Sequence, residues 1–357
     1  MFSAMRYPER ILPWCLIALL LCSASCKNDR ATYHIREFPP TTIFDSVVDM
    51  TPAYAKGFKV RYLSDGTPLI DIANPQDSIS EENDTLRLAL IRKGHSTENV
   101  PAGYRCLNVP IRGAVCTDLT QVSFFIGLDS VHIIKGVPSP QSQHAEQIID
   151  FVESGDIQII GTMHSPDIDA IRRLGADIVL VSPPLIGDKR LSDLPSTAIP
   201  VYCNLERHPL ALAEWIKLIA MLIGKETAGS DFFGKAEQHY NEATYSILEV
   251  RSRPTLVLFK DNGFLKEPIN TDALMEQIIG DAGAIIRHPA TAAGTSSKGS
   301  AMIEAYWQPE GKSGMLSFEE TIPVAPDVLI RDLISIVHPE VIPKDSVWER
   351  RFFHPKR

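Results

Sequence analysis

The feature that most constrains the fold is an alternation of short apolar runs with helical patterns, which begins at Thr85. Each run is bounded by Gly, Pro or Asp and has the length of a buried strand. Strands that alternate with helices at this spacing are typical of an α/β fold with a mostly parallel sheet. The runs predicted to form strands are Leu86–Ile91, Ile111–Cys116, Val131–Ile134, Ile157–Ile160, Ile178–Val181 and Ile199–Tyr202.

Two segments between these runs carry helix signals. Leu119–Leu128 follows the second run with an apolar helical pattern. Ser165 is a good N-cap residue, Pro166 suits the first helical position, and acidic residues follow, so a helix is predicted from there to Leu174. Both helices would return the chain to the start of a parallel strand.

Ahead of this region, residues 59–72 alternate apolar and polar side chains on either side of Ser64, Asp65 and Gly66. A Gly-containing turn between two alternating segments is the pattern of a β-hairpin. We therefore expect an N-terminal β-hairpin in front of the first α/β lobe.

A long helical region follows the first lobe. Apolar residues recur at helical spacing over Pro209–Ile223 and again over Ser230–Val250, with Gly224 between them. The second sheet is predicted from Thr255–Phe259, Ala284–Arg287 and a strand and helix within Val324–Ile336. The predicted fold class is α/β, with two Rossmann-like lobes of mostly parallel strands joined by a long, stiff connecting helix.

The N-terminus carries an export signal. Arg6 and Arg10 precede an apolar segment, Ile11–Leu21, which is too short to cross a bilayer. Small residues then lead to Cys26 and a polar run. Small residues directly before a Cys resemble a bacterial lipobox, which implies cleavage before Cys26 and acylation of its sulfur and new amino group. An ordinary secretory signal is the alternative.

These signals predict how the chain is organised and where it is located. The predicted parts are a lipoprotein signal peptide (residues 1–25), a tether (26–45), an N-terminal lobe (46–205), a spanning helix region (206–252) and a C-terminal lobe (253–357). We expect a cell-envelope protein, anchored to the lipid bilayer through acylated Cys26 and facing the periplasm or the exterior.

Composition and charge narrow the choice of partner. The net charge is −9 and no basic block occurs, which argues against nucleic acid as a partner. Of six cysteines, Cys106, Cys116 and Cys203 remain beyond the signal and Cys26. An odd number gives no disulfide framework, so we expect buried, reduced side chains, with a Cys106–Cys116 pair as the alternative. Their spacing does not suggest structural zinc.

Four stretches, taken in order, carry a resemblance to a known family: Pro110–Asp118, Ile160–Leu180, Glu206–Lys217 and Met315–Ile330. They resemble the first cleft loop, an acidic segment ending in Pro-Asp, the entry to the spanning helix and a second acidic segment. The family is that of the ABC-importer substrate-binding proteins for iron–siderophores, haem or cobalamin, the class III periplasmic binding proteins. The first Pro-Asp is Ala176-Asp177 here, and Asp169 stands where the family has Glu.

The resemblance implies a protein without catalytic activity or cofactor. Such a protein delivers an organic metal chelate or tetrapyrrole to a dimeric ABC permease. One acidic residue of each lobe meets an Arg of the permease, and these residues are Asp169 and Glu319 here, with Glu320 as the fallback. The alternative is that both carboxylates serve the electrostatics of a helix start.

Ligands of open parallel sheets bind outside the carboxyl ends of the strands, which here would face the cleft. The candidate ligand-binding residues are Thr117, Asp118, Thr162, Met163, His164, Pro183, Arg207, His208, Lys260, Phe264 and Arg287. Phe264 could cover a flat macrocycle, and the cationic side chains could meet anionic groups. His164 and His208 are the metal-ligand candidates, although a single His before a helix is more often a hydrogen-bonding surface residue.

Two rival functions come from other classes. An exported hydrolase would need a nucleophile placed beside a base, and no G-x-S-x-G, H-E-x-x-H or Walker motif occurs in the sequence. A zinc- or manganese-binding protein of the same shape would gather several His and a carboxylate in its cleft.

Overall fold

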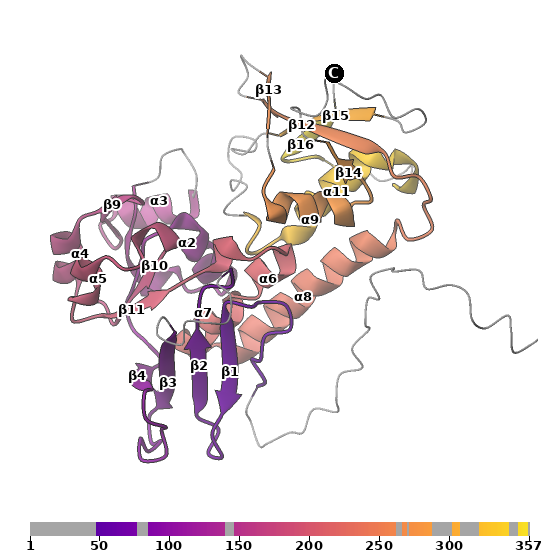
Figure 1. Ribbon diagram of the computed structural model, residues 1–357. Coiled ribbons are helices and arrows are strands. Elements are labelled where there is room, and N and C mark those ends of the chain that lie inside the picture. Colours follow the sequence, from indigo (N-terminus) through magenta and orange to yellow (C-terminus); the bar gives the residue numbers. More distant parts are fainter. Residues whose placement is uncertain are drawn as a thin grey trace, which may run out of the picture. The chain divides into compact units, whose positions relative to one another are not determined.

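The computed structural model describes residues 48–76, 85–139, 146–261, 266–269, 271–287, 302–307, 321–342 and 349–355 (Figure 1). The chain divides into two units, Met1–Val47 and Val48–Arg357, and every described residue lies in the second. Cys26, Phe264, Glu319 and Glu320 lie outside the described residues. The predicted lobe boundaries at residues 205 and 252 stay predictions.

The first sheet contains the predicted hairpin. Its strands, in spatial order, are β1 (Phe58–Tyr62), β2 (Pro68–Ile72), β3 (Leu86–Arg92) and β4 (Arg105–Val109). β1 and β2 are antiparallel, and the turn between them is held by the Thr67 N–H, which donates to Asp65 Oδ1 over 2.9 Å. Gly66 adopts a positive φ of 81°, which explains the glycine at this position.

β3 was predicted as a strand, but its place among the sheets differs from the one expected. The run at Leu86–Ile91 is a strand, but it pairs with β2 and β4 rather than with the parallel sheet of the α/β lobe. Its alternate side chains face two clusters, since Leu88 and Leu90 belong to the main core whereas Ala89 and Ile91 join Leu69 in a small separate one. Each face of β3 is therefore buried against a different part of the chain.

The second sheet is the predicted parallel sheet. Its spatial order is β11 (Thr197–Pro200), β10 (Ile178–Val181), β5 (Ala114–Cys116), β6 (Ile134–Val137) and β7 (Gln158–Ile159). All neighbouring pairs in it are parallel. The residues of β10 are buried on both faces, as expected for a parallel strand covered by helices.

The helices that connect these strands are α2 (Leu119–Gly127), α3 (Glu146–Glu153), α4 (Ile168–Leu174) and α5 (Lys189–Ser192). α4 begins later than predicted, because its N-cap is Asp167, whose Oδ1 accepts from the Ala170 N–H. Ser165–Pro166 instead forms β9, which pairs with β8 (Gly161–Thr162). The first residues of the run predicted as a strand at Val131 form a 3₁₀ turn, Val131–Ile133, ahead of β6.

The connecting region consists of α6 (Pro209–Ala213), α7 (Ile216–Ile223) and α8 (Glu226–Tyr245). Gly224 ends α7 in the left-handed conformation, with φ of 71°, and α8 then packs back against α7. A Cβ atom at Gly229 would lie 2.4 Å from the Ala220 Cβ atom, so this packing requires glycine. The long connecting helix is therefore α8 alone, with 20 residues and a length of about 30 Å.

The third sheet follows α8. Its spatial order is β13 (Lys266–Pro268), β12 (Thr255–Asp261), β15 (Met302–Trp307) and β16 (Phe353–Pro355), with β14 (Ile285–Ile286) also paired to β12. β12 is parallel to β14 and β15, whereas β13 and β16 are antiparallel to their neighbours. The sheet is thus mixed rather than purely parallel.

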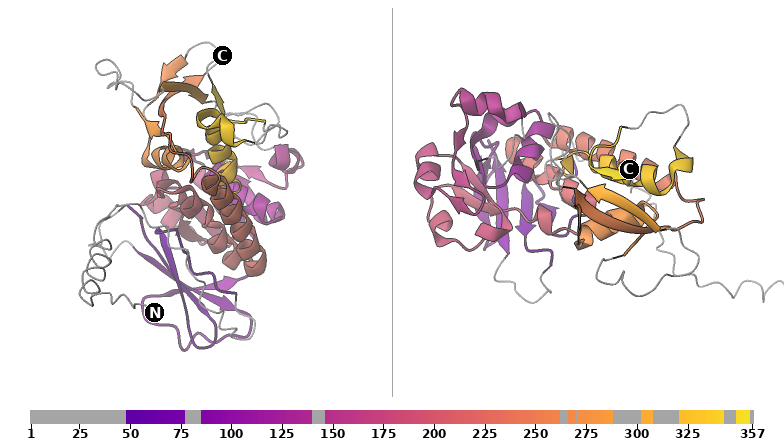
Figure 2. Two further views of the ribbon diagram at one scale, coloured as in Figure 1. Left: turned by 90° about the vertical axis from the view of Figure 1, so that its right-hand side faces the viewer. Right: turned by 90° about the horizontal axis from the view of Figure 1, so that it is seen from above.

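Two helices accompany the third sheet, α9 (Ala273–Asp281) and α11 (Pro326–Val337). The strand predicted within Val324–Ile336 is absent, because this apolar segment is one helix that packs against α8 and α9 (Figure 2). The fold is a mixed α/β fold, as the sequence predicts, and α8 lies between the parallel second sheet and the mixed third sheet along the chain. The first sheet also contains one parallel pair, β3 with β4. None of the described helices is both long and apolar enough to span a membrane.

Candidate functional site

The loops at the carboxyl ends of β5 and β10 are locked together by Thr117 and Ser182. The Ser182 N–H donates to Thr117 Oγ1 over 2.9 Å, and the Thr117 hydroxyl donates to Ser182 Oγ over 3.3 Å. Both residues are buried. Thr117 therefore braces the edge of the sheet, and its predicted contact with a ligand stays a prediction.

Asp118 is also engaged within the protein. Its Oδ1 atom accepts from the Thr120 N–H over 2.7 Å and caps α2, and Gln121 completes a capping box. The Asp118 residue is 5% exposed. The carboxylate thus stabilises the start of α2, and its predicted contact with a ligand stays a prediction.

Thr162, Met163 and His164 lie in the tight turn between β8 and β9. Thr162 Oγ1 accepts from the Ser165 N–H over 3.1 Å, and the Ser139 N–H at the end of β6 donates to the Gly161 carbonyl over 2.7 Å. Thr162 and His164 are exposed and Met163 is half-buried. The turn therefore presents a hydroxyl, a thioether and an imidazole close to the carboxyl ends of the strands.

The loop after β10 is apolar. Pro183 opens a 3₁₀ turn, Pro183–Leu185, and is half-buried, whereas Pro184 and Ile186 are exposed. An exposed apolar loop beside polar ones is the mixture found in small-molecule sites.

The loop after β11 carries Arg207. The 3₁₀ turn Cys203–Leu205 precedes it, and the side-chain amide of Asn204 donates to Thr120 Oγ1 over 3.5 Å. This contact ties the loop after β11 to α2, just as Thr117 ties the loop after β5 to the loop after β10. Arg207 and Asn204 are exposed. The loops of three neighbouring strands therefore meet at one edge of the sheet and expose a guanidinium group.

His208 links this edge to the C-terminal region. Its Nδ1 atom accepts from the Leu210 N–H over 3.1 Å and caps α6, and its Nε2 atom lies 3.7 Å from Asp281 Oδ2 at the end of α9. Burial lowers the pKa of His208, and the Asp281 carboxylate partly offsets this. A ring with both nitrogen atoms engaged in this way is poorly placed to ligate a metal.

Sequence reasoning missed the residues around His208. Asp281 accepts from the Tyr240 hydroxyl over 2.7 Å and from the Gln277 amide over 2.8 Å. The Tyr54 ring stacks on His208 with a centroid distance of 5.6 Å and an interplanar angle of 26°. These partners lie far apart along the chain, and no local pattern joins them.

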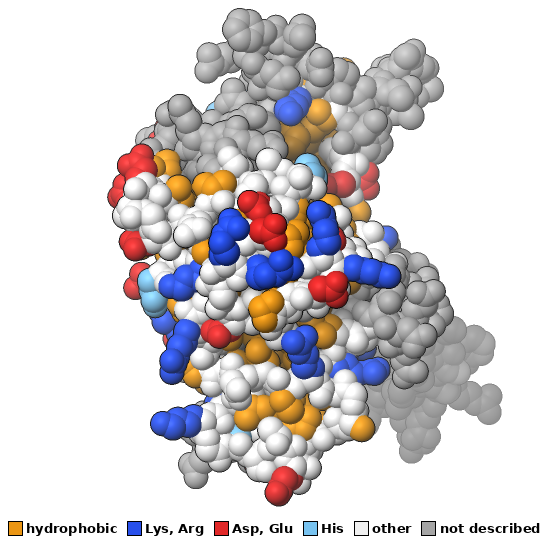
Figure 3. Space-filling model, turned by 90° about the vertical axis from the view of Figure 1, so that its left-hand side faces the viewer, with side chains coloured by type: hydrophobic (Ala, Val, Ile, Leu, Met, Phe, Trp, Pro, Cys, Tyr) orange, Lys and Arg blue, Asp and Glu red, His pale blue; other side chains and the backbone are white. Residues whose placement is uncertain are grey.

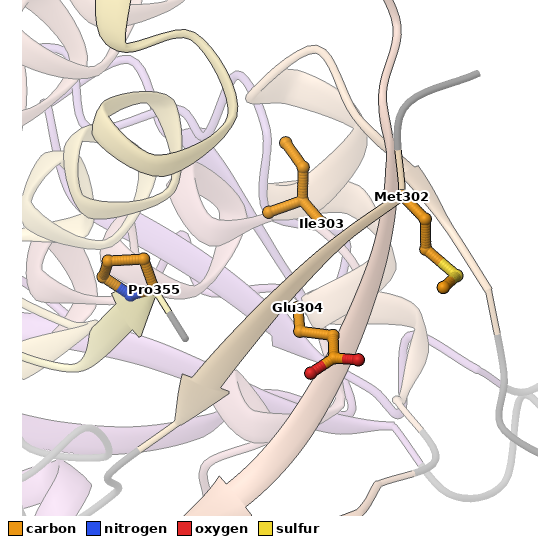
Figure 4. Close-up of a pocket in the computed structure, with 4 residues that line it drawn as sticks. All are labelled: Met302, Ile303, Glu304 and Pro355. Atoms are coloured by element: carbon orange, nitrogen blue, oxygen red, sulfur yellow. The ribbon is translucent and has the colours of Figure 1, made fainter. Parts of the chain in front are cut away.

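The predicted residues of the C-terminal lobe lie on the third sheet. Lys260 is in β12, and Arg287 follows β14, where its N–H donates to the Leu256 carbonyl over 2.9 Å. Both side chains are half-buried. A hollow of about 390 Å³ lies elsewhere on this sheet and is lined by Met302, Ile303, Glu304 and Pro355 (Figure 4).

The predicted docking residue Asp169 lies in the first turn of α4. Its side chain is 75% exposed, but Oδ1 accepts from Arg172 Nη1 over 2.9 Å. Lys and Arg side chains gather on the face that α4 and α5 form (Figure 3), and Arg173, Lys189 and Arg190 are among the exposed ones. A permease Arg would therefore have to compete with Arg172 for this carboxylate.

The three described cysteines are free. Burial raises the thiol pKa of Cys116 and of Cys203, so neither is an activated nucleophile at neutral pH. Cys106 is exposed, contrary to the expectation that it would be buried. Among the described residues, no three His, Cys, Asp or Glu side chains are grouped so that they could hold a metal ion.

The chain was compared with protein families, with curated proteins and with solved structures. No protein-family model matches it. It is 22% identical over 151 residues to an uncharacterized lipoprotein of Methanocaldococcus jannaschii, and the match covers 40% of this chain and 36% of that relative. The match thus spans about a third of the relative's length.

Solved structures with a similar arrangement include three binding proteins. The siderophore-binding protein BauB, bound to acinetobactin and ferric iron, has a TM-score of 0.42 and 15% identity, over 54% of this chain and 65% of BauB. The haem-binding protein RhuT of Roseiflexus has a TM-score of 0.39, 14% identity and coverage of 52% and 68%. Haem-bound IsdE of S. aureus has a TM-score of 0.38, 12% identity and coverage of 49% and 64%. The solved structures that this chain resembles therefore include substrate-binding proteins for siderophores and haem.

Proposed function

We propose that this chain is a substrate-binding protein of the cell envelope that delivers an iron chelate, haem or cobalamin to an ABC importer. The observation that supports it is the meeting of the loops after β5, β10 and β11 at one edge of a parallel sheet. That edge contacts α9 of the C-terminal region through His208 and Asp281. Edges of this kind are where open α/β sheets bind ligands.

The chemistry of the exposed residues at this edge suits an organic anion. Pro184 and Ile186 offer apolar surface, and Arg207 offers a guanidinium group that can pair with a carboxylate or a catecholate oxygen. The acylated Cys26 would hold the protein at the bilayer, and Asp169 and Glu319 would meet a dimeric permease. We keep these three residues as parts of the proposal.

The test is direct binding by the full-length mature lipoprotein in detergent. Haemin, a ferric catecholate, a ferric hydroxamate, cyanocobalamin and zinc chloride are each titrated, with absorbance and calorimetry as the readouts. We expect sub-micromolar binding of one chelate or tetrapyrrole. Sub-micromolar binding of zinc without any chelate, or of nothing in the series, would contradict the proposal.

Arg207 provides a matched pair of variants. Arg207→Glu should weaken binding of the chelate at least tenfold, because it places a negative charge where the ligand anion would lie. Arg112→Glu is the control, since Arg112 is equally an exposed arginine but precedes β5 at the opposite edge of the sheet. Equal affinities of the two variants would remove Arg207 from the site.

Docking is tested separately by transport. Asp169→Lys should reduce uptake and leave chelate affinity within about twofold, a difference of about 0.4 kcal/mol. Asp231→Lys, on the exposed side of α8, is the control. Normal uptake by the Asp169 variant would show that Asp169 does not dock.

A further inference from the structure

A short segment near the start of the described chain, Thr51–Gly57, lies across the entry to the connecting helices, and we call it the N-terminal strap. Five successive backbone N–H groups of the strap donate to two buried carboxylates. Those of Ala53, Tyr54 and Ala55 donate to Glu214 over 2.7, 2.7 and 2.8 Å, and those of Lys56 and Gly57 donate to Glu206 Oε1 over 2.9 Å each. Glu214 is 0% exposed and Glu206 is 4% exposed.

Glu206 belongs to the candidate ligand loop itself. It lies between Leu205 and Arg207, and its side chain turns inward to the strap while the side chain of Arg207 is exposed. The Trp215 indole N–H donates to the same Oε1 atom over 3.2 Å. A carboxylate held by three donors fixes the backbone on which Arg207 is carried.

The strap also holds His208. Tyr54 stacks on the imidazole, and its hydroxyl donates to Glu237 Oε1 of α8 over 2.6 Å. The ring must keep one orientation to accept from the Leu210 N–H and cap α6. Tyr54 thus packs against the capping side chain and limits its rotation.

The strap passes close to the Trp215 ring and leaves little room for a side chain. A Cβ atom at Gly57 would lie 2.6 Å from Trp215 Cζ2, so glycine is required for the strap to reach Glu206. Phe58, the next residue, packs edge-on against the same indole ring with centroids 5.1 Å apart. The strap and the loop are therefore fitted to each other around Trp215.

We propose that the N-terminal strap is a positioning element for the ligand loop Asn204–His208. Through Glu206 and His208 it sets the direction in which Arg207 is presented. The consequence for ligand affinity rests on the proposed function, whereas the mechanical link between strap and loop does not.

The first experiment needs no ligand. Amide hydrogen exchange is measured on the full-length mature protein for wild type, Tyr54→Ala and Tyr54→Phe. We expect exchange over residues 204–210 to be at least tenfold faster in Tyr54→Ala and to return to within about twofold of wild type in Tyr54→Phe, which keeps the ring. Unchanged exchange in Tyr54→Ala would overturn the proposal.

Two further variants serve as a control and as a substitute in this experiment. Tyr104→Ala removes a half-buried tyrosine directly before β4, whose hydroxyl contacts Arg61 and Asp71 of the first sheet, and it should leave exchange over residues 204–210 unchanged. Acceleration of equal size in Tyr104→Ala would mean general loosening and would also overturn the proposal. If Tyr54→Ala fails to fold, Tyr54→Leu fills the space without a stacking ring and is judged by the same criterion.

The second experiment uses haemin as the probe. We expect Tyr54→Ala to bind haemin at least fivefold more weakly than wild type and Tyr54→Phe to bind it within about twofold. Haemin affinity that stays unchanged in Tyr54→Ala would overturn the role of the strap in binding. If wild type binds no chelate or tetrapyrrole, the proposed function fails, and the exchange experiment still decides whether the strap positions the loop.

Discussion

The two ends of the described chain are held by the same kind of interaction, in which one buried carboxylate accepts three successive backbone N–H groups. Near the N-terminus, Glu214 accepts three successive backbone N–H groups of the strap through both oxygen atoms. Near the C-terminus, Asp332 of α11 accepts those of Arg351, Phe352 and Phe353 through Oδ2 alone, over 2.9, 2.8 and 3.3 Å. Both carboxylates are 0% exposed.

At the N-terminal end, a lysine side chain accompanies Glu214. Lys217 Nζ donates to Glu214 Oε1 over 2.7 Å, and the side chain of Lys217 is 10% exposed. The same ammonium group lies 4.6 Å from the centroid of the Phe233 ring. Loss of Glu214 would therefore leave a buried cation as well as three unpaired backbone donors, so its removal should lower the free energy of unfolding strongly.

The largest expected effect is that of Glu214→Ala. Removing one partner of a buried ion pair costs about 3–5 kcal/mol. Chemical denaturation at pH 7 measures the free energy of unfolding. In the background of Glu214→Ala, Lys217→Met should recover part of the loss, because it removes the unpaired cation. If the second change gave no recovery, the unpaired ammonium would not contribute to the loss.

A smaller effect is expected for Asp332→Ala. It leaves three backbone donors without this acceptor, and a buried unsatisfied group costs about 1–3 kcal/mol. We expect a loss of about 2–3 kcal/mol from the same measurement, with a smaller loss for Asp332→Asn, which keeps an oxygen acceptor. A loss larger than that of Glu214→Ala would reverse the comparison.

The smallest effect is that of Glu206→Gln, and its sign depends on pH. Burial raises the pKa of Glu206 above its ordinary value of 4.5. The protonated form is thus favoured by folding, so the contribution of Glu206 to stability is fully present below pH 4.5 and is lost as the pH rises through the folded pKa. Glutamine keeps the acceptor oxygen and does not titrate.

The variant should therefore gain stability relative to wild type between pH 4 and pH 7. Denaturation curves at both values, with Gln238→Glu on the exposed side of α8 as a titrating control, measure this difference. A relative loss of stability across that range would mean that the hydrogen bonds to Glu206 outweigh its desolvation.

Local sequence patterns were sufficient to predict the elements whose apolar residues follow a regular strand or turn pattern. Ile178–Val181 is a continuous apolar run and forms β10, and Asp65 with Gly66 marks the turn between β1 and β2. The N-cap of α4 was misplaced by two residues, since both Ser165 and Asp167 are good caps. The pairing of Ser165 with Thr162 across the β8–β9 turn decided between them.

The candidate site was less predictable, because it depends on distant partners. Nothing near Thr117 in the sequence shows that its hydroxyl donates to Ser182, which lies 65 residues further along the chain. Glu206 and Glu214 belong to a recognisable stretch, but nothing local shows that their carboxylates bind Lys56 or Ala53. The segment that contains β15 has no regular apolar period, and its strand is defined by pairing with β12.

The order in which the hydrogen bonds follow one another along the strap determines which of them would break first if the chain were pulled at Val48. A pull on Val48 is resisted first by the Tyr62 hydroxyl, which donates to the Val48 carbonyl and accepts from the Met50 N–H, and next by the three hydrogen bonds to Glu214. Those to Glu206 come last along the chain. Tension applied at the N-terminal end of the strap would thus load Tyr62 and Glu214 before it reached Glu206, so the loop Asn204–His208 would be protected from it.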